Sequence, residues 1–204
     1  MTGAVLLVAW RDAAPATPPG WRCEPVLADQ SALDRAGSKG RTPPPFHAVL
    51  WSDDPDVALR LPDLLVDRVA RWSAFRVRSH AAWDDTTATR VRPTAKQVSF
   101  LRARPELAAE TFTRHYREHA AVARAHQPAI CRYTQHDVLD AAGDGGLETH
   151  GISELWFADE ATLVARYYAG PESIAVVRAD NREYIDFGGT LSLLVRPVDA
   201  RSSR

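Results

Sequence analysis

The second half of this 204-residue chain alternates strand-like and helical segments in an order that few folds accommodate. Runs rich in Val, Ile, Leu and aromatic residues mark four strands, at residues 97–103, 129–140, 151–158 and 190–195. One helical segment lies between the first two strands. Another, interrupted by Gly170 and Pro171, lies between the last two. The order is therefore strand, helix, strand, strand, helix, strand.

That order predicts an α+β fold built from ferredoxin-like units. A ferredoxin-like sheet carries its helices on one face only, and its other face is apolar and requires cover. The expected solution is a pair of sheets packed face to face. We expect the two sheets to come from two halves of one chain. A homodimer formed through the second half alone is the competing arrangement.

A weak internal repeat supports two related halves. Residues 46–53 (FHAVLWSD) are similar to residues 151–159 (GISELWFAD), and Asp53 aligns with Asp159. The first helix of the unit has no clear counterpart in the first half. Only the loop-like stretch 11–40 is available for it, so the first half is expected to be a degenerate copy.

A polar connector separates the two halves. Residues 84–89 show no apolar periodicity, and we place the boundary near Pro93. Residues 1–92 then form the degenerate ferredoxin-like half, and residues 93–204 form the better-preserved domain. We expect the first half to act as the structural partner of the second.

The helical segment after the first strand of the second half carries the most informative pattern. Its apolar and aromatic positions recur at i, i+4, i+8, i+11 and i+15, namely at Ala108, Phe112, Tyr116, His119 and Ala123. Residues at this spacing share one helix face. Tyr116 and His119 should therefore point inward with Phe112. An inward histidine is either a general acid or base, because imidazole titrates near neutral pH, or a packed residue that caps a carbonyl.

Two neighbouring strands carry further polar residues. Alternation over 129–140 puts Ile130, Thr134, His136 and Val138 on one face, and Tyr133 on the other. His136 lines a pocket if its face borders one, and otherwise packs at an edge or under a helix.

Glu154 and Trp156 share a face of the next strand. A carboxylate beside a tryptophan in an apolar pocket would have a raised pKa. A Glu154 that is exposed or salt-bridged at the interface between the two sheets is the other interpretation. Among the aspartates, Asp159 is expected to cap the helix that follows it, and Asp180 and Asp186 to organise the turn into the last strand.

Composition excludes several classes of protein. The net charge is −1, so no basic excess predicts binding to nucleic acid or to an anionic membrane surface. Apolar runs are too short to cross a membrane, and no secretory signal is recognised at the N-terminus. Cys23 and Cys131 lack the spacing of a zinc site. We expect a cytoplasmic protein with reduced cysteines.

Cofactor signatures are also absent from the sequence. It has no GxGxxG or Walker loop for a nucleotide and no GxSxG elbow. His115 and His119 are spaced i, i+4, but no glutamate of an HExxH motif lies between them and no third metal ligand is evident. We expect neither a metal nor a cofactor. Haem bound through a histidine is a weaker third alternative.

Several blocks of the second half resemble the EthD domain, a family of the dimeric α+β barrel superfamily. They occur in order at sensible spacing: Arg102-Ala-Arg-Pro-Glu-Leu, Phe112, Tyr116-Arg-Glu-His119-Ala, Gly151-Ile-Ser-Glu-Leu-Trp156-Phe-Ala-Asp159, Ala179-Asp180 and Tyr184-Ile-Asp186. The resemblance covers mainly residues 96–197. It implies ferredoxin-like halves whose sheets pair into a barrel of the dimeric α+β type, with a small, mostly apolar pocket between sheet and helices. The family's usual histidine falls on His119.

The resemblance leads to two hypotheses about function. The first is a cofactor-independent enzyme, a cyclase, dehydratase or isomerase (lyase or isomerase class), that acts on an aromatic or polyketide-like small molecule. His119 or His136 would move a proton at a carbon next to a carbonyl, and Tyr116 would polarise the carbonyl oxygen. Substrate contacts are expected from Phe112, Glu154 and Trp156. The alternative is a non-catalytic module that binds a small apolar compound for a biosynthetic or degradative pathway.

Overall fold

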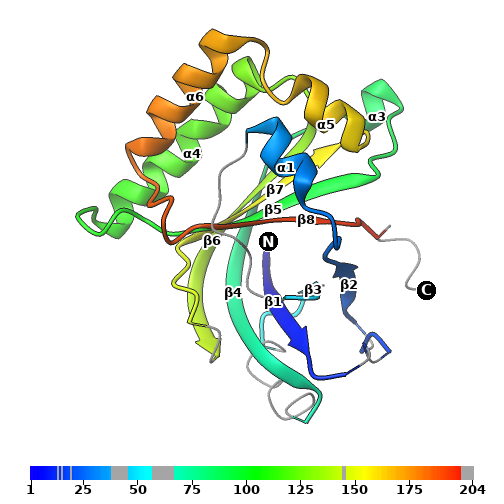
Figure 1. Cartoon of the computed structure of the whole chain (residues 1–204). Helices are drawn as coiled ribbons and strands as arrows, with labels where there is room; N and C mark the ends of the chain where they lie inside the picture. Colours follow the sequence, from blue (N-terminus) through cyan, green and yellow to red (C-terminus); the bar gives the residue numbers. More distant parts are fainter. Residues whose placement is uncertain are drawn as a thin grey trace.

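The structure is a computed structural model that describes residues 1–198 apart from 13, 15, 19, 38–45, 57–66, 144 and 145. Eight antiparallel strands form one sheet. They are β1 (Thr2–Trp10), β2 (Arg22–Pro25), β3 (Ala48–Ser52), β4 (Val69–Asp84), β5 (Ala95–Leu101), β6 (Ile130–Gly143), β7 (Gly151–Phe157) and β8 (Leu191–Val195). The described helices are α1 (Ser31–Ala36), α3 (Thr86–Thr89), α4 (Ala109–His126), α5 (Glu160–Arg166) and α6 (Pro171–Arg182). Figure 1 shows the longest of them, α4 and α6, together on one side of the sheet.

The two halves of the chain have the same strand order. The whole sheet runs β2-β3-β1-β4-β6-β7-β5-β8. In each half the first strand is flanked by the third and the fourth, and the second strand lies beyond the third, which is the ferredoxin-like order. The predicted pair of ferredoxin-like halves within one chain is therefore confirmed. In the first half the described residues between β1 and β2 form no helix, and the helix within residues 11–40, α1, follows β2.

The sheet curls until its two edge strands meet. The halves are joined along β4 and β6, which pair from Ser73–Gly143 to Asp84–Arg132. At the other edge the amide of Leu27 donates to the carbonyl of Leu194 at 2.9 Å, and the amide of Arg196 donates to the carbonyl of Pro25 at 2.9 Å. These bonds hold the end of β2 against β8, so the sheet encloses a barrel interior.

Apolar side chains from both halves fill most of this interior. They include Val5, Leu7, Val49, Phe75, Val98, Phe100, Ile152 and Leu193, all at most 1% exposed. The rings of Phe75 and Phe100, one from each half, lie 5.6 Å apart between centroids. Each half thus covers the apolar sheet face of the other, as the sequence pattern requires.

One helix of the first half crosses to the second. The apolar face of α1, formed by Ala32, Leu33 and Ala36, packs in the same core as Leu163 of α5 and Leu194 of β8. This helix lies next to α5 in Figure 1. The side chain of Gln30, which precedes α1, accepts from the amide of Leu194 at 2.7 Å. The first half therefore contributes to the helical layer of the second half as well as to the barrel.

The predicted inward face of α4 is confirmed. Its buried residues are Phe112, Tyr116, His119 and Ala123. The predicted face of Ile130 is wrong, because the ladder between β6 and β7 shifts register between Ile130 and Arg132. This irregularity places Ile130 in the core on the helix side together with Tyr133, whereas Val138 packs on the barrel side.

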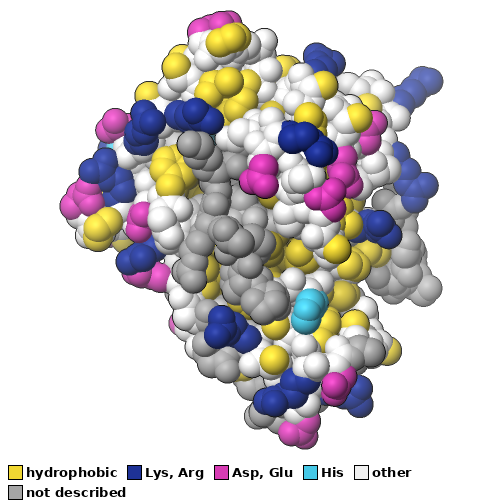
Figure 2. Space-filling view, in the orientation of Figure 1, with side chains coloured by type: hydrophobic (Ala, Val, Ile, Leu, Met, Phe, Trp, Pro, Cys, Tyr) yellow, Lys and Arg dark blue, Asp and Glu magenta, His cyan; other side chains and the backbone are white. Residues whose placement is uncertain are grey.

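Surface charge does not form a single-sign field on the face shown in Figure 2, where basic and acidic side chains are interspersed. None of the helices in the described part of the chain is long and apolar enough to cross a membrane.

Candidate functional site

A cavity of about 310 Å³ lies on the helix side of the second-half sheet. Residues on β5, β6 and β7, and at and just before β8, form its floor: Gln97, Ser99, Leu101, Tyr133, Ser153, Leu155, Thr190 and Ser192. Helices α4 and α6 and the segments after α5 and α6 form the remaining walls, which include His119, Tyr167, Tyr168, Arg178, Asn181, Arg182, Tyr184 and Phe187. The lining combines aromatic rings with many hydroxyl and amide groups, so it is more polar than the expected mostly apolar pocket.

His119 is the histidine that lines this cavity. Its side chain comes from the inward face of α4, and the residue is 8% exposed. Its Nδ1 atom lies 2.6 Å from Oδ2 of Asp180 on α6. A carboxylate on Nδ1 favours the tautomer in which Nδ1 carries the proton, and Nε2 then has an available lone pair. A histidine oriented by a carboxylate in this way is an arrangement that recurs in general-base catalysis.

Two buried tyrosines provide hydroxyl groups at the cavity. Burial raises the pKa of Tyr133, and it raises the pKa of Tyr184 well above the ordinary value, so both stay protonated. The hydroxyl of Tyr184 donates to Oδ1 of Asn181 at 3.1 Å. The hydroxyl of Tyr133 accepts from Nε2 of Gln135 at 3.1 Å and lies 3.4 Å from Oγ of Ser153. Because the amide of Gln135 donates a hydrogen bond to the oxygen of Tyr133, the hydroxyl of Tyr133 can donate its own hydrogen bond to a ligand.

The floor carries a chain of hydrogen bonds between side chains. Nε2 of Gln97 donates to Oγ of Ser99 at 2.9 Å, and Oγ of Ser99 lies 2.9 Å from Oγ of Ser192. The hydroxyl of Tyr167 donates to Oε1 of Gln97 at 3.3 Å. Serine hydroxyls can reverse donor and acceptor roles. The floor can therefore accommodate several oxygen atoms of a ligand in either sense.

Tyr116 is next to this cavity but does not line it. It is fully buried, and its hydroxyl donates to the carbonyl of Ile152 at 2.6 Å. The same hydroxyl accepts from the amide of His136 at 3.3 Å. Gly151 allows the ring to approach β7, because a Cβ atom at that position would lie 2.9 Å from Cε1 of Tyr116. Phe112 stacks on Tyr116 with 5.7 Å between ring centroids and is not a lining residue either.

The other predicted site residues lie on the opposite face of the sheet, inside the barrel. Nε2 of His136 is 2.9 Å from Oε1 of Glu154, and Nδ1 of His136 is 2.9 Å from Oγ of Ser79 on β4. The ammonium group of Lys96 lies 4.5 Å from the ring centre of Trp156. Glu154 and Trp156 share a strand face, as predicted. The predicted site residues therefore lie on two faces of the sheet. His119 lines the cavity on the helix side, whereas His136 and Glu154 lie inside the barrel.

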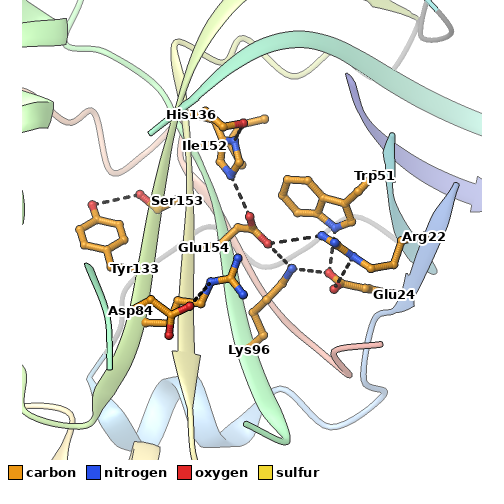
Figure 3. Close-up of polar contacts among 12 residues, drawn as sticks. Arg22, Glu24, Trp51, Asp84, Lys96, Tyr133, His136, Ile152, Ser153 and Glu154 are labelled. Carbon is orange, nitrogen blue, oxygen red and sulfur yellow. Dashed lines mark hydrogen bonds and ion pairs between the residues drawn. The ribbon is translucent and has the colours of Figure 1, made fainter. Parts of the chain in front are cut away.

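The barrel interior holds a buried cluster of charges that spans both halves (Figure 3). Lys96, which is fully buried, forms ion pairs with Glu154 and with Glu24 of the first half. Nε1 of Trp51 donates to Oε2 of Glu24 at 2.8 Å, and Nε of Arg22 lies 3.2 Å from Oε1 of the same carboxylate. The cluster, composed of Arg22, Glu24, Lys96, His136 and Glu154, joins β2 to β5, β6 and β7.

The charge state of Glu154 follows from this cluster. Burial acts to raise its pKa, but the charge of Lys96, the hydrogen bond from His136 and the charge of Arg22 outweigh burial and hold the pKa far below its usual range. A raised pKa beside Trp156 was one interpretation of the sequence, and the structure corrects it. The salt-bridged alternative describes Glu154, which is therefore an ionised structural carboxylate and a poor proton donor near neutral pH.

The described residues contain no group of three or more His, Cys, Asp and Glu side chains that could hold a metal ion. Of the i, i+4 pair, Nδ1 of His119 contacts Asp180, and the ring of His115 lies parallel to that of Tyr184, 6.3 Å away between centroids.

Comparison with known families gives a match for most of the second half. Residues 104–188 match the family described as the EthD domain. The second half of this chain is similar to the EthD domain family over this range. The matched range includes His119, Tyr133, Asp180 and Tyr184, whereas Gln97, Ser99 and Ser192 on the cavity floor lie outside it.

A solved structure shows the same overall fold. The chain superposes on an anthrone oxidase-like protein with a TM-score of 0.56 and 10% sequence identity, over 97% of this chain and 91% of the other. A provisionally named monooxygenase from Lactobacillus acidophilus NCFM gives a TM-score of 0.42 at 8% identity, over 95% of this chain and 92% of the other. No curated protein matches the sequence. The fold is that of the dimeric α+β barrel proteins, with both halves in one chain.

Three features of the helix-side cavity are missing from the sequence-based prediction. Asp180, expected to organise a turn, is instead the partner of His119, although Asp186 does accept from the amide of Gly188 at 2.9 Å in that turn. Tyr133 was expected only on the face opposite His136, where it packs in the helix-side core and also lines the cavity, and Arg178 and Arg182 were not considered. The spacing of Arg178, Asn181 and Arg182 could have indicated a shared helix face, because they recur at i, i+3 and i+4 in the segment before Tyr184.

Proposed function

We propose that this protein is an enzyme that removes a proton from a carbon next to the carbonyl of an aromatic or polyketide-like molecule held in the helix-side cavity. Such a step initiates cyclisation, dehydration or isomerisation. The observation that carries the proposal is the position of His119, whose ring lines the cavity while Asp180 occupies its Nδ1 atom. The proposal rests on side chains alone and assigns no role to a cofactor.

In this proposal Nε2 of His119 is the general base. Asp180 fixes the tautomer that leaves the Nε2 lone pair available and stabilises the imidazolium that forms when the proton arrives. Imidazole suits this task because its pKa lies close to neutral pH. The same imidazolium can return the proton to another atom of the substrate, which isomerisation requires, or to a leaving hydroxyl, which dehydration requires.

We assign stabilisation of the enolate oxygen to Tyr133 instead of Tyr116. The hydroxyl of Tyr116 is already bound to the carbonyl of Ile152, whereas Tyr133 lines the cavity and receives a hydrogen bond from Gln135. A neutral donor fixed before reaction stabilises charge as it develops on the oxygen. Because its pKa is raised, Tyr133 remains a donor and does not compete with His119 for the substrate proton.

The shape and chemistry of the cavity match an oxygenated aromatic compound. Tyr167, Tyr184 and Phe187 offer ring faces and edges on the helix side, and Ser99 and Ser192 offer hydroxyls on the sheet side. Aromatic walls with a few fixed polar groups are typical of small-molecule sites. The name of the structural neighbour, anthrone oxidase-like, is in keeping with an aromatic ketone as substrate.

Deuterium exchange into a probe ketone tests the proposal. Anthrone under nitrogen in buffered D₂O loses its methylene proton at a rate that NMR measures. The wild-type protein should accelerate this loss, and His119→Ala should reduce the acceleration by about 10²-fold or more. His80→Ala is the matched control, because His80 is exposed and does not line the cavity. Binding of anthrone without acceleration would instead support the non-catalytic binding module.

A further inference from the structure

The cavity contains two guanidinium groups that the proposed proton transfer does not use. Arg178 and Arg182 both line it from α6, one helical turn apart, with Asn181 between them on the same face. Arg178 forms a hydrogen bond with the hydroxyl of Tyr168, another lining residue. This bond fixes the guanidinium of Arg178 at the wall of the cavity.

One carboxylate, that of Asp180, borders the cavity through its contact with His119. The described residues that line the cavity include no Asp or Glu. Nearby arginines differ: Arg102 lies 3.0 Å from Glu148, and Arg104 pairs with Glu106. Within the described part of the chain, neither Arg178 nor Arg182 has such an ion pair. The cavity therefore has an excess of positive charge.

We propose that the substrate is an aromatic carboxylic acid whose carboxylate binds Arg178 and Arg182; this inference rests on the proposed function. Guanidinium groups present planar sets of donors that match the two oxygens of a carboxylate. Both arginines lie on the same helix as Asp180. An acid anchored there is held beside the helix that orients His119, with its ring directed toward Tyr184 and Phe187.

A carboxylate can contribute to affinity here because a charge-assisted hydrogen bond is stronger than a neutral one. Arg178 is partly buried and Arg182 is exposed, so Arg178 is the better shielded of the two from water. The arginines would then select the substrate, while His119 and Tyr133 act on its ketone part. Substrate binding and proton transfer thus depend on different residues, so substitutions can abolish one without the other.

Calorimetric titration with an acid and its isosteric amide tests this inference. The probes are 3-hydroxy-2-naphthoate and 3-hydroxy-2-naphthamide, which differ in charge and hardly in size. The wild-type protein should bind the acid about tenfold tighter than the amide, or more, as one charge-assisted contact allows. The double variant Arg178→Gln/Arg182→Gln should bind both probes with similar affinity. Arg166→Gln, an exposed arginine at the end of α5, is the matched control and should keep the preference.

Two outcomes would overturn the inference. One is a wild-type protein that binds acid and amide equally or binds neither; the other is a double variant that keeps the preference. Circular dichroism establishes that each variant is folded, and the affinity of the wild-type protein for the acid should fall as salt is added. Since anthrone carries no carboxylate, its deuterium exchange tests the proposed function separately. Exchange with no acid preference contradicts this inference alone, and an acid preference without exchange contradicts only the proposed function.

Discussion

Nδ1 of His119 lies 2.6 Å from Oδ2 of Asp180, a residue 61 positions further along the chain and on a different helix. The contact joins α4 to α6 directly above a sheet floor lined with hydroxyl groups. In the proposed reaction this contact selects the tautomer whose Nε2 atom accepts the substrate proton. The first prediction concerns this contact.

Asp180→Asn should reduce the exchange of anthrone by at least about 10²-fold while the protein stays folded. An amide in place of the carboxylate can donate to Nδ1 and so favours the tautomer with the proton on Nε2, which cannot accept one from the substrate. The ¹⁵N chemical shifts of His119 report the tautomer directly. If Asp180 had only a structural role, the ¹⁵N chemical shifts of His119 in the folded variant would equal those in the wild-type protein. That result would contradict the orienting role of Asp180.

The two tyrosines near the cavity should respond differently to loss of their hydroxyl. Tyr116→Phe leaves the carbonyl of Ile152 without its donor and should lower the free energy of unfolding by about 1–3 kcal/mol. Tyr133→Phe should instead slow anthrone exchange by about tenfold or more, because it removes the donor to the enolate oxygen. Urea unfolding and exchange rates measured on both variants separate the effects. Slower exchange in folded Tyr116→Phe than in Tyr133→Phe would reverse the assignment.

Lys96→Met should be strongly destabilising. The variant leaves Glu24 and Glu154 buried without their shared cation, and removal of one partner from a buried ion pair costs about 3–5 kcal/mol. Arg114→Met is the matched surface control, because Arg114 forms an exposed i, i+4 pair with Glu118, and such pairs contribute only about 0.3–0.5 kcal/mol. Urea unfolding measures both. Equal, small losses in the two variants would show that the cluster does not stabilise the barrel.

Acid should weaken the barrel through Glu154. Its pKa in the folded protein is depressed, so the unfolded state takes up a proton first as the pH falls. The stabilising contribution is therefore fully present above the unfolded pKa of about 4.3 and is lost progressively below it. Unfolding free energies measured from pH 6 to pH 3 should fall less steeply in Glu154→Gln than in the wild type. Identical slopes would contradict the assigned charge state.

Local patterns in the sequence predict much of this fold. The spacing of Phe112, Tyr116 and His119 identifies the inward face of α4, because burial follows the helical period. Asp159 accepts from the amide of Thr162 at 2.6 Å, as its position before a helical segment predicts. The order of strands and helices also predicts the paired halves, since an uncovered apolar sheet face requires a second sheet.

Contacts between distant residues could not be predicted in the same way. Nothing local pairs His119 with Asp180, because the contact depends on how α4 and α6 pack. The register shift after Ile130 changes which residues share a face, and alternation alone does not reveal it. Lys96 was an available signal, since a lysine within an apolar strand requires a buried partner, but its partners Glu24 and Glu154 come from separate strands.

The most direct test of the account is chemical rescue of His119. In His119→Gly the exchange of anthrone with D₂O should fall toward the uncatalysed rate, and added imidazole should restore it with saturation as the small base occupies the vacated space. Asp180 would orient the added imidazole as it orients the natural side chain. Exchange in His119→Gly that equals the wild-type rate without imidazole would contradict the claim that His119 is the base.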